Sequence, residues 1–262
     1  MSETKDLFTT KMRKSTRTIH NVSDALVNAK FAISLRDEQV WGGGLFIFYY
    51  VFAYLEEAKD RLQIKKAFEE DLKHYLGDDW RSAPKAPAVD NYMEHLAALE
   101  RDNPKLLMAY IYHMYLGLLS GGQILAKKRL IRGQKLVPIS IDTDLRILTT
   151  SPRFSINKTL ISFFTENSKT EIYKDKVTDF TGVDIAKLKT DFRKAMNEIA
   201  DKLTEEEKQA IIDEGNQVFV MNNLIVNSVS GQNAVLYNYL YKLSAFVLLV
   251  GGIVYAYKLH VK

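Results

Sequence analysis

Apolar residues recur three and four positions apart along most of the 262-residue chain, which is the spacing of one face of an α-helix. Only 13 glycines and 5 prolines interrupt this pattern, and the connections between periodic segments are short. The pattern therefore predicts an all-α fold, built as a single helical domain. Helices are expected over residues 6–29, 38–62, 66–76, 88–100, 105–131, 154–167, 185–203 and 205–229.

Helix-start signals support three of these ranges. Asp184 can cap the helix that follows it, and Thr204 with Glu207 forms an S/T-x-x-E capping box. Pro104 suits the first turn of a helix, because a proline there sacrifices no hydrogen bond. Residues 169–182 carry no such signal and are expected to be a polar insertion.

The last apolar stretch differs from the others. Fifteen uncharged residues occupy 243–257, and the run reaches the roughly 20 residues that span a bilayer if it is extended back to Ala234. Lys242 would then extend its ammonium group to the lipid headgroups. Because residues 245–254 are apolar on every side, a membrane anchor is favoured over a buried or amphipathic last helix. We expect a helical domain over 1–227, a linker over 228–233 and a transmembrane anchor over 234–259.

Composition narrows the possible ligands. The 36 basic and 32 acidic residues are interspersed, so the net charge of +4 argues against a nucleic-acid interface. The absence of cysteine excludes disulfides, zinc–thiolate sites and haem held by a thiolate. The N-terminal residues carry no apolar stretch typical of a signal peptide, so the helical domain is expected in the cytosol.

Histidines are the first candidates for metal binding. His74 and His95 fall among charged residues, where solvated positions are expected, and His260 follows the predicted anchor. His20 is more informative, because Asp24 lies one turn later on the same helix face. There it can hold the Nδ1 proton and direct Nε2 at a metal. From the spacing alone an interfacial histidine on an amphipathic helix is favoured, because a single histidine has little specificity.

The segment YLGLLSGGQ, residues 115–123, sets Gly117 and Gly121 four apart inside an apolar helix. Each interior glycine costs roughly 1 kcal/mol relative to alanine, so the pair indicates a close approach or a bend. Helix packing would explain the two glycines alone. The further small residues Ser120 and Gly122 favour a helix that kinks over something planar.

Two pairs of basic residues are spaced one helical turn apart, Lys189 with Arg193 and Arg13 with Arg17. Pairs with this spacing can bind carboxylates at the mouth of a pocket. A solvated helix surface is the alternative for both pairs.

Five stretches, in order, resemble the membrane-anchored haem oxygenases. They are RKSTRTIHNVSDALVNAKF (13–31), FYYVFAYLEE (48–57), FEEDLKHYLGDDW (68–80), AYIYHMYLGLLSGGQ (109–123) and KLKTDFRKAMN (187–197). The resemblance covers most of residues 6–227. It implies a helical fold that holds haem between a proximal and a distal helix.

The resemblance also implies a role for each candidate residue. His20 matches the axial ligand of the haem iron, and Asp24 stands where a glutamate supports that ligand. Gly117 and Gly121 match distal glycines whose backbone lies over the haem, with Ser120 beside them. The positions that bind the haem propionates are matched by Arg13, where the family has lysine, and by Tyr112, Lys189 and Arg193.

The implied activity is oxidative opening of haem to biliverdin, carbon monoxide and ferrous iron, with haem as both substrate and prosthetic group. Dioxygen (O2) and electrons from NADPH-cytochrome P450 reductase would be consumed, and biliverdin reductase is a further implied partner. The anchored type implies the endoplasmic reticulum membrane, with the catalytic domain facing the cytosol.

Two residues depart from the family pattern. Leu118 stands where the distal motif has an aspartate, whose carboxylate holds a water network that delivers protons. Slower turnover or a relaxed choice of the attacked meso carbon is expected, unless Ser120 or Gln123 carries the waters. His113, one turn before Gly117, could bind the iron or pack at the pocket rim, and the rim is favoured. The alternative functions are a non-catalytic haem-binding or haem-sensing protein and a helical adaptor that binds no haem.

Overall fold

The computed structural model describes residues 7–34, 37–57, 64–134 and 173–260, and every regular element within these ranges is helical. The all-α prediction is therefore confirmed for the described part of the chain. The predicted helix over 154–167 lies outside the described residues.

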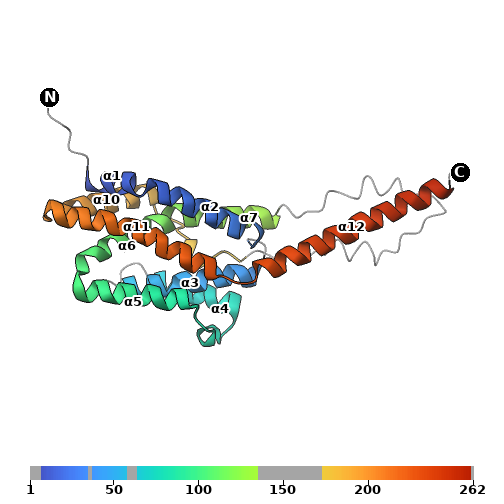
Figure 1. Cartoon of the computed structure of the whole chain (residues 1–262), viewed down its shortest axis with the longest axis horizontal. Helices are drawn as coiled ribbons and strands as arrows, with labels where there is room; N and C mark the ends of the chain where they lie inside the picture. Colours follow the sequence, from blue (N-terminus) through green and yellow to red (C-terminus); the bar gives the residue numbers. More distant parts are fainter. Residues whose placement is uncertain (1–6, 35–36, 58–63, 135–172, 261–262) are drawn as a thin grey trace, which may run out of the picture.

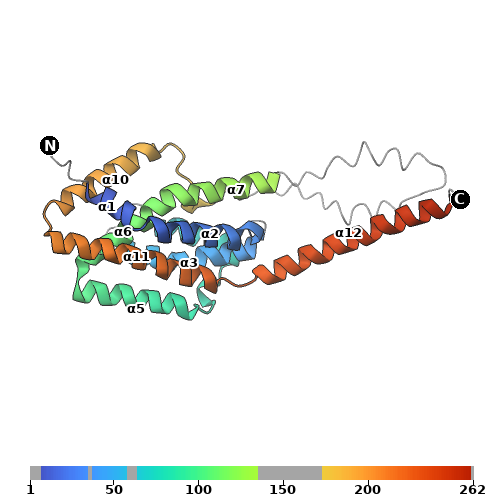
Figure 2. The ribbon, with the colours of Figure 1, turned by 45° about the horizontal axis from the view of Figure 1, so that its top comes forward.

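The first predicted helix is divided in two. Helices α1 (Phe8–Ser15) and α2 (Arg17–Ser34) meet at Thr16, whose hydroxyl donates to the carbonyl of Met12 over 2.9 Å. A threonine bonded one turn back bends a helix, which gives the break a local cause. Helix α1 then packs on α10 (Ile185–Ala200) and α11 (Glu205–Ser228), whereas α2 packs on α11 and on α3 (Figures 1 and 2).

A close helix pair forms one side of the body. Helices α3 (Glu38–Glu57) and α4 (Ile64–Leu76) approach each other at Gly42, where a Cβ atom would lie 2.7 Å from Cβ of Tyr75. The carboxylate of Glu56 accepts hydrogen bonds from the backbone N–H groups of Ile64 and Lys65, at 3.0 and 2.7 Å, and so caps α4. Helix α5 (Pro87–Asp102) follows the short turn η1 (Trp80–Ser82) and begins with the proline itself.

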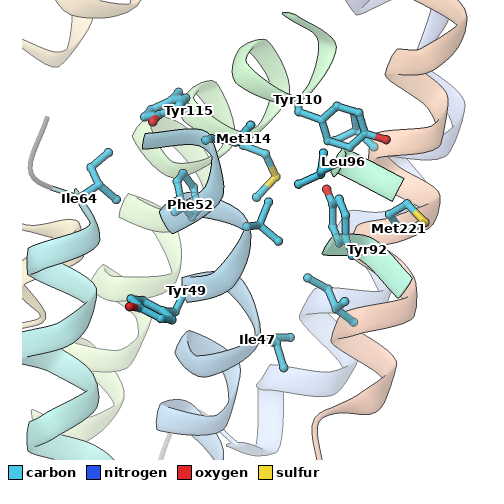
Figure 3. Packing of buried hydrophobic residues seen from close by; sticks show 14 of the residues in the cluster. Ile47, Tyr49, Phe52, Ile64, Tyr92, Leu96, Tyr110, Met114, Tyr115 and Met221 are labelled. Atoms are coloured by element: carbon cyan, nitrogen blue, oxygen red, sulfur yellow. The ribbon is translucent and has the colours of Figure 1, made fainter. Parts of the chain in front are cut away.

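Aromatic and aliphatic side chains fill the core between α3, α5, α11 and α6 (Leu107–Gly117), and Figure 3 shows Tyr92 and Tyr110 close to Leu96. Tyr92 and Tyr110 are fully buried, and the Tyr110 hydroxyl donates to Glu214 over 2.7 Å. The same carboxylate oxygen lies 2.8 Å from Nε2 of His95, so the predicted solvated position of His95 is wrong. Its neighbours in sequence are charged, but its partner lies 119 residues away on α11.

Residues 173–182 belong to the folded body, although a polar insertion was expected there. Asp71 of α4 is fully buried and accepts the N–H groups of Lys176 and Val177, at 2.8 and 2.9 Å. Both lie in the short turn η4 (Lys176–Thr178), and Val177 is buried in the core. Burial raises the pKa of Asp71 to about 6, against these hydrogen bonds, which lower it.

The predicted caps of the C-terminal helices are confirmed. The Asp184 side chain accepts the N–H of Lys187 over 3.0 Å at the start of α10. Thr204 and Glu207 exchange both hydrogen bonds of the capping box at the start of α11. Residues this close in sequence fix helix starts without help from the rest of the fold.

Helix α12 (Gln232–His260) follows Gly231, which has a left-handed φ of 94°, and extends away from the body (Figure 1). Among the residues that the structure describes, no helix combines the length and the apolar character that crossing a membrane requires. The transmembrane anchor predicted over 234–259 is therefore not confirmed. Asn238 and Lys242 interrupt the apolar run, and the side chains of 236, 239, 249–250 and 253–259 lie outside the described set.

Candidate functional site

His20 lies near the start of α2, and its side chain is 52% exposed. Its Nδ1 atom is 3.2 Å from Oδ2 of Asp24, one turn later, as the spacing predicted. Because Nδ1 faces the carboxylate, Nε2 is the nitrogen available to a ligand.

The distal helix departs from α-helical geometry where the glycines occur. Helix α6 ends at Gly117, a π-helical turn η3 covers Leu118–Gly122, and α7 continues over Gln123–Gln134. A Cβ atom at Gly117 or Gly121 would meet no atom within 4 Å. We refer to these two residues as the glycine strip. Since packing against another helix would put atoms there, the strip borders open space. The π-helical turn is a local departure from α-helical geometry, whereas the kink over a planar group stays a prediction.

Helix α2 runs alongside α7 in the same direction (Figures 1 and 2). Lys128 of α7 donates from Nζ to Oδ1 of Asn28 on α2 over 3.0 Å. Going back about 10–12 Å along each helix axis from this bridge leads to His20 on α2 and to Gly121 on the distal helix. The two predicted halves of the site therefore lie on neighbouring helices, each about two turns before the bridge between Asn28 and Lys128.

The basic residues gather at another edge of the strip. Lys189 of α10 donates from Nζ to Oγ of Ser120 in η3 over 3.0 Å. Burial raises the pKa of Tyr112, while the charges of Arg193 and Arg13 lower it and Arg193 also hydrogen-bonds the hydroxyl. Tyr112 itself donates to the carbonyl of Thr9 over 3.1 Å. Arg193 thus contacts Tyr112, Arg13 lies near enough for its charge to act on the same hydroxyl, and Lys189 lies one turn from Arg193.

Leu118 is half-buried and packs on the hydrophobic core, with Cδ1 3.1 Å from where a Cβ of Gly122 would be. The leucine side chain brings no polar group to the distal turn. Of the two substitutes weighed from the sequence, the Gln123 amide donates to the carbonyl of Thr178 over 2.8 Å. The hydroxyl of Ser120 faces the ammonium group of Lys189. Ser120 is the better placed of the two to hold water.

His113 lies in the interior, whereas the rim of the pocket was expected. Its Nε2 atom is buried and has no hydrogen-bond partner among the described residues. A Cβ atom at Gly215 of α11 would be only 3.0 Å from that nitrogen. Burial lowers the pKa of His113 to about 4, with a smaller contribution from the charge of His20. An imidazole enclosed in this way is a packing residue, and it does not compete for a metal in the open space.

Leucine in place of His113 is expected to reduce the loss of stability in acid. The unfolded chain binds a proton at this histidine below its ordinary pKa of 6.5, whereas the folded chain does so only near 4. The contribution of His113 to the free energy of unfolding is therefore fully present above pH 6.5. It falls by about 3 kcal/mol between pH 6.5 and 4. Urea unfolding across that range should give a shallower pH dependence for His113→Leu than for the unchanged protein. Parallel curves would show that the imidazole is not held neutral.

Two contacts at the site could not be found from the sequence. Phe219 of α11 touches the imidazole ring of His20, with ring centroids 5.3 Å apart. Asn28 and Lys128 bridge α2 and α7. The residues next to them in the sequence do not mark one phenylalanine among 13, or one lysine on a solvated helix, as part of a site.

Comparison with known proteins agrees with this geometry. The profile of the family described as "Heme oxygenase" matches residues 6–228. Human "Heme oxygenase 1" is 31% identical over 136 residues, 44% of this chain and 46% of that protein. "Heme oxygenase 1" of Synechocystis is 30% identical over 173 residues, 65% of this chain and 56% of that protein. The chain thus spans about half the length of the curated relatives it matches.

Solved structures agree in fold. Heme oxygenase 2 of Chlamydomonas reinhardtii without heme superposes with a TM-score of 0.61 at 24% identity, over 86% of this chain and 98% of that one. Heme oxygenase-1 of Synechocystis in complex with heme gives a TM-score of 0.62 at 21% identity, over 94% and 99%. The protein has the all-α haem oxygenase-like fold. The chain belongs to the haem oxygenase family.

Proposed function

We propose that the protein is a haem oxygenase, which opens haem oxidatively to biliverdin, carbon monoxide and ferrous iron. One observation carries the proposal: His20, with Nδ1 turned to Asp24, lies on the helix beside the one whose glycine strip borders open space. A flat macrocycle needs a ligand on one face and bare backbone on the other. The residues of the chain therefore fit a haem group.

Each residue has a task in this proposal. His20 would hold the iron through Nε2, and Asp24 would keep the ring in the required tautomer. Arg13, Lys189 and Arg193 would bind the propionates, and the Tyr112 hydroxyl would add a hydrogen bond. When bound, the haem supplies the iron and the oxidisable ring for the reaction with dioxygen. The glycine strip leaves room above the iron and excludes side chains that would compete for it.

The experiment is a titration of the protein with haemin, followed by turnover with dioxygen and a reductant. Saturation at one haem per chain, followed by release of biliverdin and carbon monoxide, is the expected result. A chain that binds no stoichiometric haem would be a helical adaptor instead.

Turnover is proposed to be slow or poorly selective for one meso carbon, because Leu118 brings no carboxylate to the distal turn. Aspartate at this position should speed biliverdin formation about tenfold, a small part of the 10²–10⁴-fold that a positioned acid–base group contributes. The mixture of biliverdin isomers should also become simpler. Chromatographic separation of the isomers measures both effects.

Asparagine at position 118 is the matched control, since it has the size of aspartate without its charge. Equal gains from Leu118→Asp and Leu118→Asn would indicate that shape, and not proton delivery, limits the reaction. No gain from either would leave Ser120, beside Lys189, as the group that carries the waters.

A non-catalytic haem-binding or haem-sensing protein is the second candidate. It is favoured by the apolar packing of Leu118, which removes the acid–base group from the distal turn. Stoichiometric haem binding without carbon monoxide or biliverdin would distinguish it from the enzyme.

The membrane-anchored type, the endoplasmic reticulum location and the two reductases as partners are parts of the same proposal. Support for attachment to a membrane comes from α12, which carries exposed apolar side chains along its described length: Leu240, Leu243, Phe246, Val247 and Leu248. Exposed apolar helix surface is typical of a membrane or protein contact.

Removal of residues 232–262 is expected to abolish flotation of the protein with phospholipid vesicles. Haemin binding should be unchanged, because the site residues lie on α1, α2, α6, η3 and α10. The full chain floating no better than the truncated one would exclude attachment through α12.

A further inference from the structure

Two aromatic contacts connect His20 to the interior. The ring of Phe219 meets the imidazole of His20 at a centroid distance of 5.3 Å and an interplanar angle of 65°. It meets the imidazole of His113 at 4.9 Å and 66°. Phe219 is only 9% exposed, so α11 holds it firmly while its ring touches both histidines.

His113 fills the space behind this contact. A Cβ atom at Gly215, one turn before Phe219, would lie 3.0 Å from Nε2 of His113 and 3.2 Å from Cγ2 of Thr16. Helices α6 and α11 and the start of α2 therefore meet here without spare volume. The carbonyl of Thr16 accepts the backbone N–H of His20 over 2.9 Å, so the turn that carries His20 reaches the same point on α11 as His113.

The other restraint on His20 is solvated. The side chains of His20 and Asp24 are 52% and 63% exposed, and exposed polar pairs hold side chains weakly. The interior contact with Phe219 is shielded from water and does not depend on charge. The contact with Phe219 therefore restrains the imidazole ring of His20 more firmly than the exposed pairing with Asp24 does.

We propose that Phe219 and His113 are positioning residues for His20: the phenyl ring fixes the plane of the imidazole, and His113 supports the phenyl ring from behind. This inference rests on the proposed role of His20 as the haem ligand. Because the Nε2 atom of His113 makes no hydrogen bond within the described residues, its support depends on shape. A side chain of similar size should therefore replace it.

The test compares Phe219→Ala and the milder Phe219→Leu with Phe68→Ala in the full chain. Phe68 is also a buried phenylalanine, but it packs against Phe52 on the α3–α4 side of the core. Phe219→Ala should weaken haemin binding about tenfold, as loss of an outer-shell support does at metal sites, and should split the ferric EPR signal into two populations. Phe219→Leu should show a smaller effect in the same direction. Phe68→Ala should change neither property.

A measurement on the protein without haem tests the contact between Phe219 and His20 independently of haemin affinity. In the ligand-free protein, the Cε1–H signal of His20 should move in NMR spectra when the ring current of Phe219 is lost. Equal behaviour of the Phe219 and Phe68 variants in all three measurements would overturn the proposal. His113→Leu should retain the affinity and the single EPR signal, whereas His113→Ala should resemble Phe219→Leu. Equal disruption by both His113 variants would contradict support through shape.

His20→Ala separates this inference from the proposed function. If it leaves the ferric spectrum unchanged, His20 is not the ligand and the proposed function loses its basis. If it alters the spectrum while the Phe219 variants do not, only the positioning role is refuted.

Discussion

Alanine at position 20 is expected to weaken haemin binding by more than the roughly 10–100-fold that loss of an outer-shell partner costs, because the iron loses its protein ligand. The fold should survive, since the His20 side chain is 52% exposed and leaves no cavity behind. Absorbance titration with haemin gives the affinity, and EPR of the ferric complex reports the ligand. Circular dichroism checks that the helices are intact.

His74→Ala is the matched control for this experiment. His74 is also an exposed histidine on a helix, and it stacks on Tyr173 at 3.8 Å, away from the glycine strip. Unchanged spectra in His74→Ala together with altered spectra in His20→Ala would identify the ligand. Identical spectra in the two variants would refute His20 as the ligand of the iron.

Leucine at position 121 is expected to abolish stoichiometric haem binding without destabilising the protein. In the haem-free chain a Cβ atom at Gly121 meets nothing within 4 Å, so a larger side chain fits without strain. Leucine also favours helix over glycine by about 1 kcal/mol, which should keep the midpoint of thermal unfolding equal or raise it. The same side chain would occupy the open space that the macrocycle needs. Titration with haemin and thermal unfolding measure the two effects separately.

Gly251→Leu provides the control. Gly251 is also helical and also has no atom within 4 Å of a Cβ, but it lies on α12. It should bind haemin like the unchanged protein. Normal haemin binding by Gly121→Leu would mean that the macrocycle does not lie against the glycine strip.

Much of the fold could be predicted because helix formation depends on residues that are close together in the sequence. The caps at Asp184 and Thr204 involve residues three positions apart, and both formed as expected. His20 and Asp24 lie on one face because a helix brings positions four apart together. The unusual distal turn followed from glycines that an ordinary helix would not carry.

The errors fall where the partner is distant in sequence. His95 looked solvated because its neighbours in sequence are charged, but its Nε2 atom hydrogen-bonds the carboxylate of Glu214 on another helix. Residues 173–182 looked like an insertion until Asp71, more than 100 residues earlier, was found to bind their backbone. The membrane span predicted over 234–259 is a different case: it is not confirmed, because no helix of the described residues is long and apolar enough for one.

The sequence by itself determined the helices, their caps, the backing of His20 by Asp24 and the bare backbone at positions 117 and 121, since each depends on residues within about two helical turns. Only the tertiary structure decided that α2 runs beside α7, that Lys189 reaches Ser120, and that Phe219 contacts both His20 and His113. Such contacts join helices through shape and burial, and the spacing of residues within a single helix does not encode them.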